Sequence, residues 1–180
     1  IIENYEPLKE ELIAKGYEFK SETDTEVAAH LVHDYLKQGN DLLDALRLAV
    51  QRFQGAYALL VFDANDPDRI VVTRIASPLV IGLGIGENFV ASGIPALLPV
   101  TQRFIYLEQG DVAEITRDAV RIFDAQGQPV TRAVHETQWS QEVQAVAAAL
   151  DDRVRLTTGL YGFWEWTAGG DVVTNQFVLQ

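Results

Sequence analysis

The chain has 180 residues, of which 48% are hydrophobic and 22% are charged, and its formal net charge is −12. This length and composition are those of one globular domain, or of one domain with an appendage. The acidic balance argues against nucleic acid and anionic membranes as partners, because both are bound through clustered Lys and Arg. The sequence has no cysteine, which excludes disulfides, zinc–thiolate sites and thiol catalysis for the chain as given.

The sequence also bears on where the protein works. No apolar run reaches the ~20 residues that a membrane-spanning helix needs. Glu3 and Glu6 interrupt the place where a signal peptide would carry its apolar segment. We therefore expect a soluble, cytoplasmic protein. The first residue is Ile1 rather than Met, so we expect the natural start to lie upstream.

Helices are predicted in the first third of the chain, each with apolar residues at helical spacing and a glycine at its end. Asn4 is the expected cap of the first helix, and Asn40 or Asp41 of the third. The predicted helices span residues 4–15, 25–38 and 41–54.

From Ala56 the pattern changes to short runs rich in Val, Ile and Leu, which predict strands. Segment 82–86, Gly-x-Gly-x-Gly, resembles a nucleotide-binding loop, but its spacing is wrong and a strand follows it, so a hairpin turn is the better interpretation. Helices followed by antiparallel strands indicate an α+β fold. The predicted strands span residues 56–62, 70–74, 79–83, 88–91, 104–107, 112–115 and 120–123, with a single helical turn at 94–98.

The composition changes again after about residue 137. Segment 141–150 is rich in Ala and Val and is predicted to be helical. Gly169-Gly170 is predicted to form a hairpin turn. Trp164 and Trp166 would share one face of a strand, either as a platform for a sugar or base or, as we prefer, as a pair facing the core. The strands predicted in this tail span residues 153–157, 161–166 and 172–179.

The segment 21–26, Ser-Glu-Thr-Asp-Thr-Glu, concentrates acidic and hydroxyl side chains just ahead of the second predicted helix. Thr23 and Glu26 fit a capping box, in which the Thr23 hydroxyl accepts from the amide three residues on and the Glu26 carboxylate reaches back. Asp24 is not needed for that box. Its carboxylate either serves the helix dipole or points into a site and pairs with a cationic group of a ligand. The residues alone leave both interpretations open.

A second group of polar residues lies on the same predicted helix. Glu26, His30, His33 and Asp34 are three or four residues apart and could gather as metal ligands. Such a site would need a further ligand and supporting hydrogen bonds from elsewhere in the chain. A solvated helix face is the preferred interpretation, and we assign no metal. His135 is alone near the change of composition and receives no role.

Residues 1 to about 137 resemble the glutaminase domain of glutamine–fructose-6-phosphate aminotransferase, also called glucosamine-6-phosphate synthase. Two of the matching motifs are Ser-Glu-Thr-Asp-Thr-Glu at 21–26 and Ser-Pro-Leu-Val-Ile-Gly-Leu-Gly at 77–84. Several long motifs in the same order make the resemblance specific. The remaining matches are segments 1–5, 16–19, 55–58, 86–89, 96–98 and 107–111.

This resemblance implies a four-layer αββα fold of the N-terminal-nucleophile hydrolases, of which this chain would hold a part. It implies hydrolysis of the glutamine side-chain amide, with glutamine as substrate and no cofactor. The ammonia would pass to a sugar-phosphate isomerase domain that makes glucosamine 6-phosphate, and the parent protein is expected to be a homo-oligomer. The aspartate of the 21–26 motif, here Asp24, would hold the α-amino group of glutamine.

The resemblance also shows what the chain lacks. The nucleophile of this family is a cysteine at the mature N-terminus, with its α-amine as base, and the chain has no cysteine. The Arg/His motif for the glutamine carboxylate and the Asn-Gly pair of the oxyanion hole would lie before Ile1. We therefore predict that the chain as given has no glutaminase activity. The alternatives are a non-catalytic binding or interaction module, and a chimera on the same scaffold.

The resemblance has further departures within the chain. Ala76 and Gly93 stand where the family usually has Gly and Asp. Residues 141–180 match nothing recognisable, so we divide the chain into a part of a glutaminase domain at 1–140 and an unrecognised tail of a helix and short strands at 141–180. In the family the missing front supplies strands to both sheets, and the strands of the tail could cover part of that gap.

Overall fold

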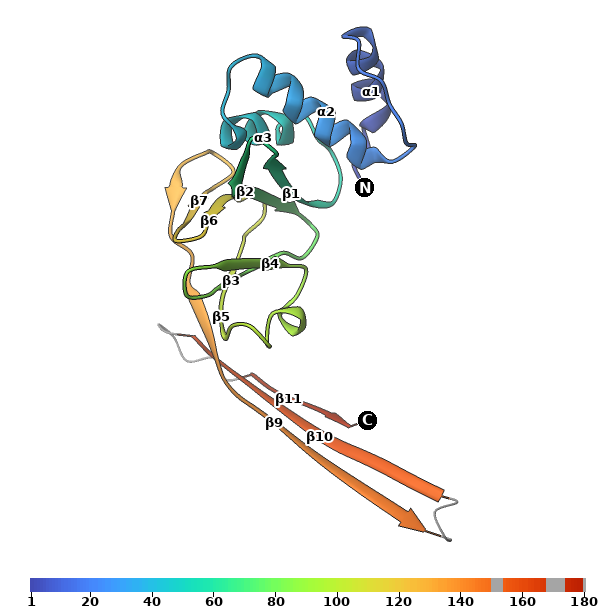
Figure 1. The fold of residues 1–180 in the computed structure, drawn as a ribbon, viewed down its shortest axis with the longest axis vertical. Helices are drawn as coiled ribbons and strands as arrows, with labels where there is room; N and C mark the ends of the chain where they lie inside the picture. The colour runs from blue at the N-terminus through green and yellow to red at the C-terminus, as the bar shows by residue number, and fades with distance from the viewer. Residues whose placement is uncertain (150–153, 168–173, 180) are drawn as a thin grey trace.

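The computed structural model describes residues 1–149, 154–167 and 174–179, with side chains for residues 1–136. Helices come first and antiparallel strands follow, as the sequence predicts, and Figure 1 shows the helices gathered at one end of the molecule. The helices are α1 (Tyr5–Ala14), α2 (Asp24–Lys37) and α3 (Leu42–Val50). Among the described residues, no helix is long and apolar enough to cross a bilayer.

The helix ends confirm some of the predicted caps and correct others. Asp41 caps α3, because its side chain accepts a hydrogen bond of 2.8 Å from the Asp44 amide. Asn4 does not cap α1 through its side chain. Instead its amide group donates to the Arg52 carbonyl at 2.8 Å and accepts from the Gln54 amide at 2.9 Å. These two hydrogen bonds to the segment just after α3 replace the predicted local cap. An Asn side chain that could cap a helix can equally bond to backbone groups elsewhere.

The first sheet has the strand order β1-β2-β6-β7-β8 and is antiparallel throughout. The predicted turn between its first two strands is shorter than expected, because β2 already begins at Asp66. A short strand at Pro129–Val130 was not predicted. The strands are β1 (Tyr57–Asp63), β2 (Asp66–Ile75), β6 (Val112–Thr116), β7 (Val120–Phe123) and β8 (Pro129–Val130).

The second sheet has the order β11-β10-β9-β5-β3-β4. Its β3 and β4 form a hairpin through 84–87, where Gly86 has a φ of 70°, so the hairpin interpretation of the glycine-rich segment is confirmed. The turn Ile94–Ala96 is a single 3₁₀ turn, as predicted. The strands are β3 (Val80–Leu83), β4 (Asn88–Ala91), β5 (Arg103–Tyr106), β9 (Val134–Ala149), β10 (Val154–Thr167) and β11 (Thr174–Leu179).

The helix predicted at 141–150 is wrong. Residues up to Ala149 belong to β9, which pairs with β10 from Val154↔Ala149 to Thr167↔His135. This long register of backbone hydrogen bonds overrides the helical propensity of the alanines. The strands predicted at 153–157 and 161–166 are one strand, β10. The predicted Gly169-Gly170 turn lies outside the described residues, as do the side chains of Trp164 and Trp166.

Alternating residues of the first sheet divide the core in two. Val71 faces the helices and belongs to the cluster with Leu12, Leu31 and Leu46. Its neighbour Val72 faces the other way and packs with residues of the second sheet. This alternation follows from the two-residue period of a strand. The described part of the chain therefore has a helical layer, a first sheet and a second sheet, which is an α+β arrangement.

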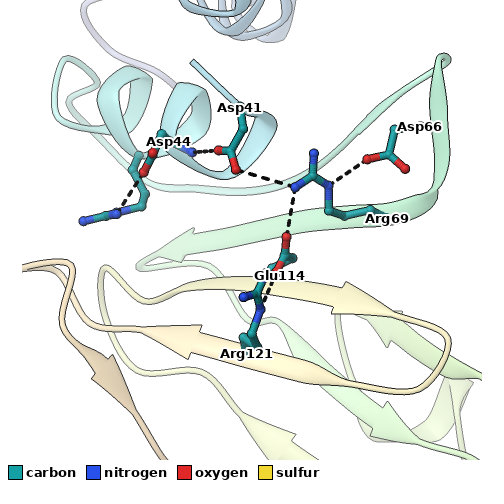
Figure 2. Close-up of polar contacts among 7 residues, drawn as sticks. Asp41, Asp44, Asp66, Arg69, Glu114 and Arg121 are labelled. Carbon is teal, nitrogen blue, oxygen red and sulfur yellow. Dashed lines mark hydrogen bonds and ion pairs between the residues drawn. The ribbon is translucent and has the colours of Figure 1, made fainter. Parts of the chain in front are cut away.

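One charged residue is buried on the helix-facing side of the first sheet. Glu114 of β6 is only 2% exposed, and its carboxylate accepts from Arg69 of β2 at 3.1 Å and from Arg121 of β7 at 2.6 Å. Arg69 also lies 3.0 Å from Asp66 and 3.6 Å from Asp41 at the start of α3 (Figure 2). This network joins three strands to a helix, and it satisfies both oxygens of the buried carboxylate.

Candidate functional site

Asp24 is the first residue of α2, and its carboxylate has a partner far away in the sequence. Its Oδ2 accepts a hydrogen bond of 2.6 Å from the backbone amide of Ile2. Its Oδ1 accepts no hydrogen bond from any residue that the structure describes. The side chain is half-buried. One oxygen is therefore fixed by the protein, while the other remains available to a donor from outside.

The segment that supplies this amide is itself held by the link between α3 and β1. Ile1 and Ala56 exchange backbone hydrogen bonds of 2.5 and 3.1 Å, and the Glu3 amide donates to Gln54 at 2.8 Å. Gly55 lies between them with a φ of 110°. A Cβ atom at Gly55 would lie 2.4 Å from the Ile1 carbonyl oxygen. This close approach requires glycine, and it sets the position of the Ile2 amide.

The segment 21–26 caps α2 differently from the predicted box. Thr23 is the N-cap residue, but its side chain makes no capping hydrogen bond. The Glu26 carboxylate does reach back, although to the amides of Lys20 and Ser21, each at 2.7 Å, and to the Ser21 hydroxyl. The Ser21 hydroxyl also accepts from the Thr23 amide at 3.3 Å. Ser21 therefore takes the place that the prediction gave to Thr23.

These hydrogen bonds stabilise the charged form of Glu26. The Ser21 hydroxyl and the Lys20 amide, together with the Ser21 amide, lower the pKa of the Glu26 carboxyl from 4.5 to about 2. The segment 21–26 is thus tied together by an ionised carboxylate at neutral pH. Asp24 takes no part in this network, which leaves it free for the contact with Ile2.

The polar residues farther along α2 do not gather around one point. His30 Nε2 lies 3.4 Å from Glu26 without hydrogen-bond geometry, and its ring packs 4.6 Å from the ring of Phe19. His33 Nδ1 lies 3.1 Å from the Tyr17 hydroxyl. Asp34 pairs with Lys15 at 2.8 Å. Among the residues that the structure describes, no three His, Cys, Asp or Glu side chains are placed to hold a metal ion.

The site leaves one carboxylate oxygen of Asp24 able to accept from a cationic group. An ammonium group is bound most strongly by a carboxylate whose position is fixed, and the Ile2 amide fixes Asp24. The sequence singles out Asp24, but it does not reveal Ile2 or Gly55 as parts of the site. Ile2 contributes through its backbone, which leaves no mark in the side-chain pattern. Gly55 looks only like the end of a helix, although its place in a matching motif was a usable signal.

Helices on one face of paired antiparallel sheets are consistent with an N-terminal-nucleophile type of glutamine amidotransferase fold. Comparison with known proteins agrees, because residues 1–99 match the glutamine amidotransferase domain family. The chain belongs to this family.

The chain is 60% identical over 132 residues to glutamine–fructose-6-phosphate aminotransferase (isomerizing) of Photorhabdus laumondii, which covers 73% of this chain and 22% of that protein. The protein of the same name from Yersinia pseudotuberculosis is 55% identical over 138 residues, with 77% and 23% covered. That of Escherichia coli is 59% identical over 132 residues, with 73% and 22% covered. The chain thus spans less than a quarter of the length of these curated relatives.

Proposed function

We propose that this chain is part of a glutaminase domain and that Asp24 binds the α-ammonium group of glutamine. The observation that carries the proposal is the half-satisfied carboxylate, whose Oδ2 is held by the Ile2 amide at 2.6 Å. Partial burial strengthens an ion pair at this position, because water screens it less. In the parent protein, we infer, the released ammonia serves an isomerase domain that converts fructose 6-phosphate to glucosamine 6-phosphate.

The residues of this chain contribute recognition rather than bond cleavage. Asp24 accepts hydrogen bonds from the substrate ammonium, and the Ile2 amide keeps the carboxylate oriented so that its free oxygen faces the ligand. Amide hydrolysis in this proposal needs a thiol nucleophile, which the 180 residues do not contain. The chain by itself therefore does not release ammonia from glutamine. Because the Arg/His motif expected for the glutamine carboxylate is also absent from it, we expect glutamine to bind weakly.

A second candidate function is a non-catalytic binding module on the same scaffold, or a chimera that contains it. The matches to its relatives leave about a quarter of this chain uncovered, which is the observation behind this candidate. The two candidates predict the same fold and the same contact at Asp24. They differ in whether a thiol and its amine base are encoded upstream of Ile1, which the genomic sequence answers.

Nuclear magnetic resonance of the ¹⁵N-labelled chain tests the proposal. Titration with glutamine is expected to shift the amide signals of Ile2 and Thr25, on either side of the Asp24 carboxylate. The control ligand is 4-carbamoylbutanoate, which is glutamine without its α-amino group, and it should leave these signals unchanged. Equal shifts with both ligands would contradict ammonium recognition by Asp24. Ammonia release by the purified chain would contradict the predicted inactivity.

A further inference from the structure

Asn4 lies two residues after the amide that holds Asp24, and both ends of its side-chain amide group are in use. Its Nδ2 donates to the Arg52 carbonyl at 2.8 Å, and its Oδ1 accepts from the Gln54 amide at 2.9 Å. Asparagine suits this place because its side chain carries both a donor and an acceptor. It therefore ties the segment of Ile2 to two backbone groups of the link between α3 and β1.

The link is itself fixed at Arg52. The Arg52 guanidinium donates to both carboxylate oxygens of Glu11 in α1, at 3.2 and 2.6 Å. The hydrogen bonds from Arg52 and then Lys15 lower the pKa of the Glu11 carboxyl from 4.5 to about 2, so the pair is charged at neutral pH. The carbonyl that Asn4 binds thus belongs to a residue with a second hold on α1.

Two other kinds of contact hold residues 1–4, and neither does the same work. The Ile2 side chain is fully buried in the core against the helices, but apolar burial has no preferred direction. The backbone hydrogen bonds of Ile1 and Glu3 to the same link involve no side chain. Asn4 adds directional side-chain contacts, because a hydrogen bond weakens steeply when it is misaligned.

A tight turn passes this hold on to the carboxylate. The Tyr5 amide donates to the Ile2 carbonyl at 3.2 Å, which closes a turn over residues 2–5. Asn4 is the third residue of that turn, with φ −97° and ψ 31°. The Ile2 amide at the start of the turn donates to Asp24 Oδ2 at 2.6 Å. A displacement of Asn4 therefore moves the donor that orients Asp24.

We propose that Asn4 is a positioning residue of the ammonium site, because it fixes the Ile2 amide and through it the direction of the Asp24 carboxylate. The inference rests on the function proposed for Asp24. Asn4 acts through Ile2 rather than on the ligand. Without its two hydrogen bonds the turn is less fixed, so Asp24 loses part of its internal hold and its open oxygen loses a set direction.

Hydrogen exchange of the ¹⁵N-labelled chain, followed by nuclear magnetic resonance without any ligand, tests the positioning. Asn4→Ala should raise the exchange rate of the Ile2 amide about tenfold, as the loss of about one hydrogen bond allows. Asn4→Asp keeps an acceptor for Gln54 but cannot donate to Arg52, so it should also raise this rate. The exchange rates of the amides within α2 and α3, read from the same spectra, show that each variant is folded.

Asn40→Ala is the matched control. The Asn40 side chain is half-buried, like that of Asn4, and its Nδ2 donates to the Tyr35 carbonyl at 2.9 Å near the C-terminal end of α2. The variant removes a comparable hydrogen bond away from the site and should leave exchange of the Ile2 amide unchanged. An Ile2 rate that Asn4→Ala leaves unchanged, or that Asn40→Ala raises equally, would overturn the proposal.

Glutamine titrations of the same variants test the consequence for binding. The glutamine concentration that gives half of the shift at Thr25 should rise about fivefold in Asn4→Ala and stay unchanged in Asn40→Ala. Equal values for wild type and Asn4→Ala would also overturn the proposal. A wild-type chain without any response to glutamine would overturn the function proposed for Asp24, whereas the ligand-free exchange rate of the Ile2 amide decides separately whether Asn4 positions it.

Discussion

Two carboxylates of this chain differ in their burial and in how many of their oxygens accept a hydrogen bond from the protein. Glu114 is buried, and each of its oxygens accepts from an arginine (Figure 2). Asp24 is half-buried, with one oxygen held by the Ile2 amide. A carboxylate with all its partners inside the protein stabilises the fold, while one with an open oxygen can receive a ligand. The difference separates a structural acid, Glu114, from the proposed binding acid, Asp24, without reference to sequence motifs.

Removing the structural acid should have the largest effect. Glu114→Gln leaves Arg69, which is only 24% exposed, without its buried counter-charge. Breaking one side of a buried ion pair costs about 3–5 kcal/mol. We expect a loss of unfolding free energy near the lower end of that range, because Arg69 keeps Asp66 and Asp41. Urea denaturation measures it, and Asp24→Asn, which can still accept from the Ile2 amide, is the comparison. Equal losses for both variants would erase the distinction between the two acids.

The glycine beside the proposed binding acid, Asp24, has the next largest expected effect. Gly55→Ala forces a φ of 110° on a residue with a Cβ, and that atom would meet the Ile1 carbonyl at 2.4 Å. We expect a loss of about 2–3 kcal/mol. Gly39→Ala is the matched control, since its φ is 93° but nothing lies within 4 Å of the added atom, so only backbone strain of about 1 kcal/mol applies. Indistinguishable denaturation midpoints would show that the contact with Ile1 is unimportant.

A smaller effect, of the opposite sign, is expected at Ala76. Its φ of 54° is left-handed, which favours glycine. Ala76→Gly should therefore stabilise the chain by about 1 kcal/mol, seen as a rise in melting temperature. Gly93, the other departure from the family pattern, has an extended φ of −168°, which any residue adopts. Gly93→Ala should consequently leave backbone strain unchanged, and a melting temperature lowered by Ala76→Gly would contradict the argument.

The smallest effect concerns pH. The folded pKa of Glu26 is about 2, below its ordinary value of 4.5, because the Ser21 hydroxyl and nearby amides bind its charged form. A lowered folded pKa gives stability that is present above about pH 4.5 and is lost as pH falls toward 2. Glu11, held by Arg52 and Lys15, also has a pKa of about 2 and acts in the same window. Glu26→Gln should therefore flatten, but not abolish, the acid side of the stability profile.

The sequence predicts much of the fold up to Phe123, because periodicity identifies the helices and the strands that follow them. It fails where distant backbone groups decide the outcome. The segment at 141–149 is a strand because it pairs with β10, against the helical propensity of its alanines. The ion pairs of Glu114 were not predicted, because its strand reads as apolar and only the folded sheet brings Arg69 and Arg121 beside it.

The site shows the same division between local pattern and long-range contact. Asp24 follows from its motif, while its partner Ile2 is 22 residues away and contributes a backbone amide. The predicted capping box was wrong in detail, because the Glu26 carboxylate bonds to the Ser21 hydroxyl, whereas the pattern pairs Glu26 with Thr23.

The role of the tail, residues 141–180, stays a prediction. Its strands extend the second sheet rather than the first (Figure 1), and deletion of 141–180 with a measurement of solubility would show whether they protect the fold.

The most direct measurement compares two acids in the first turns of different helices. Asp24 and Asp44 both lie in the first turn of a helix, but Asp44 is paired with Arg47 at 3.0 Å. Glutamine titrations followed by nuclear magnetic resonance should lose the shifts at Ile2 and Thr25 in Asp24→Asn and retain them in Asp44→Asn. Shifts that persist in Asp24→Asn, or that disappear equally in both variants, would contradict the assignment of Asp24 as the ammonium-binding residue.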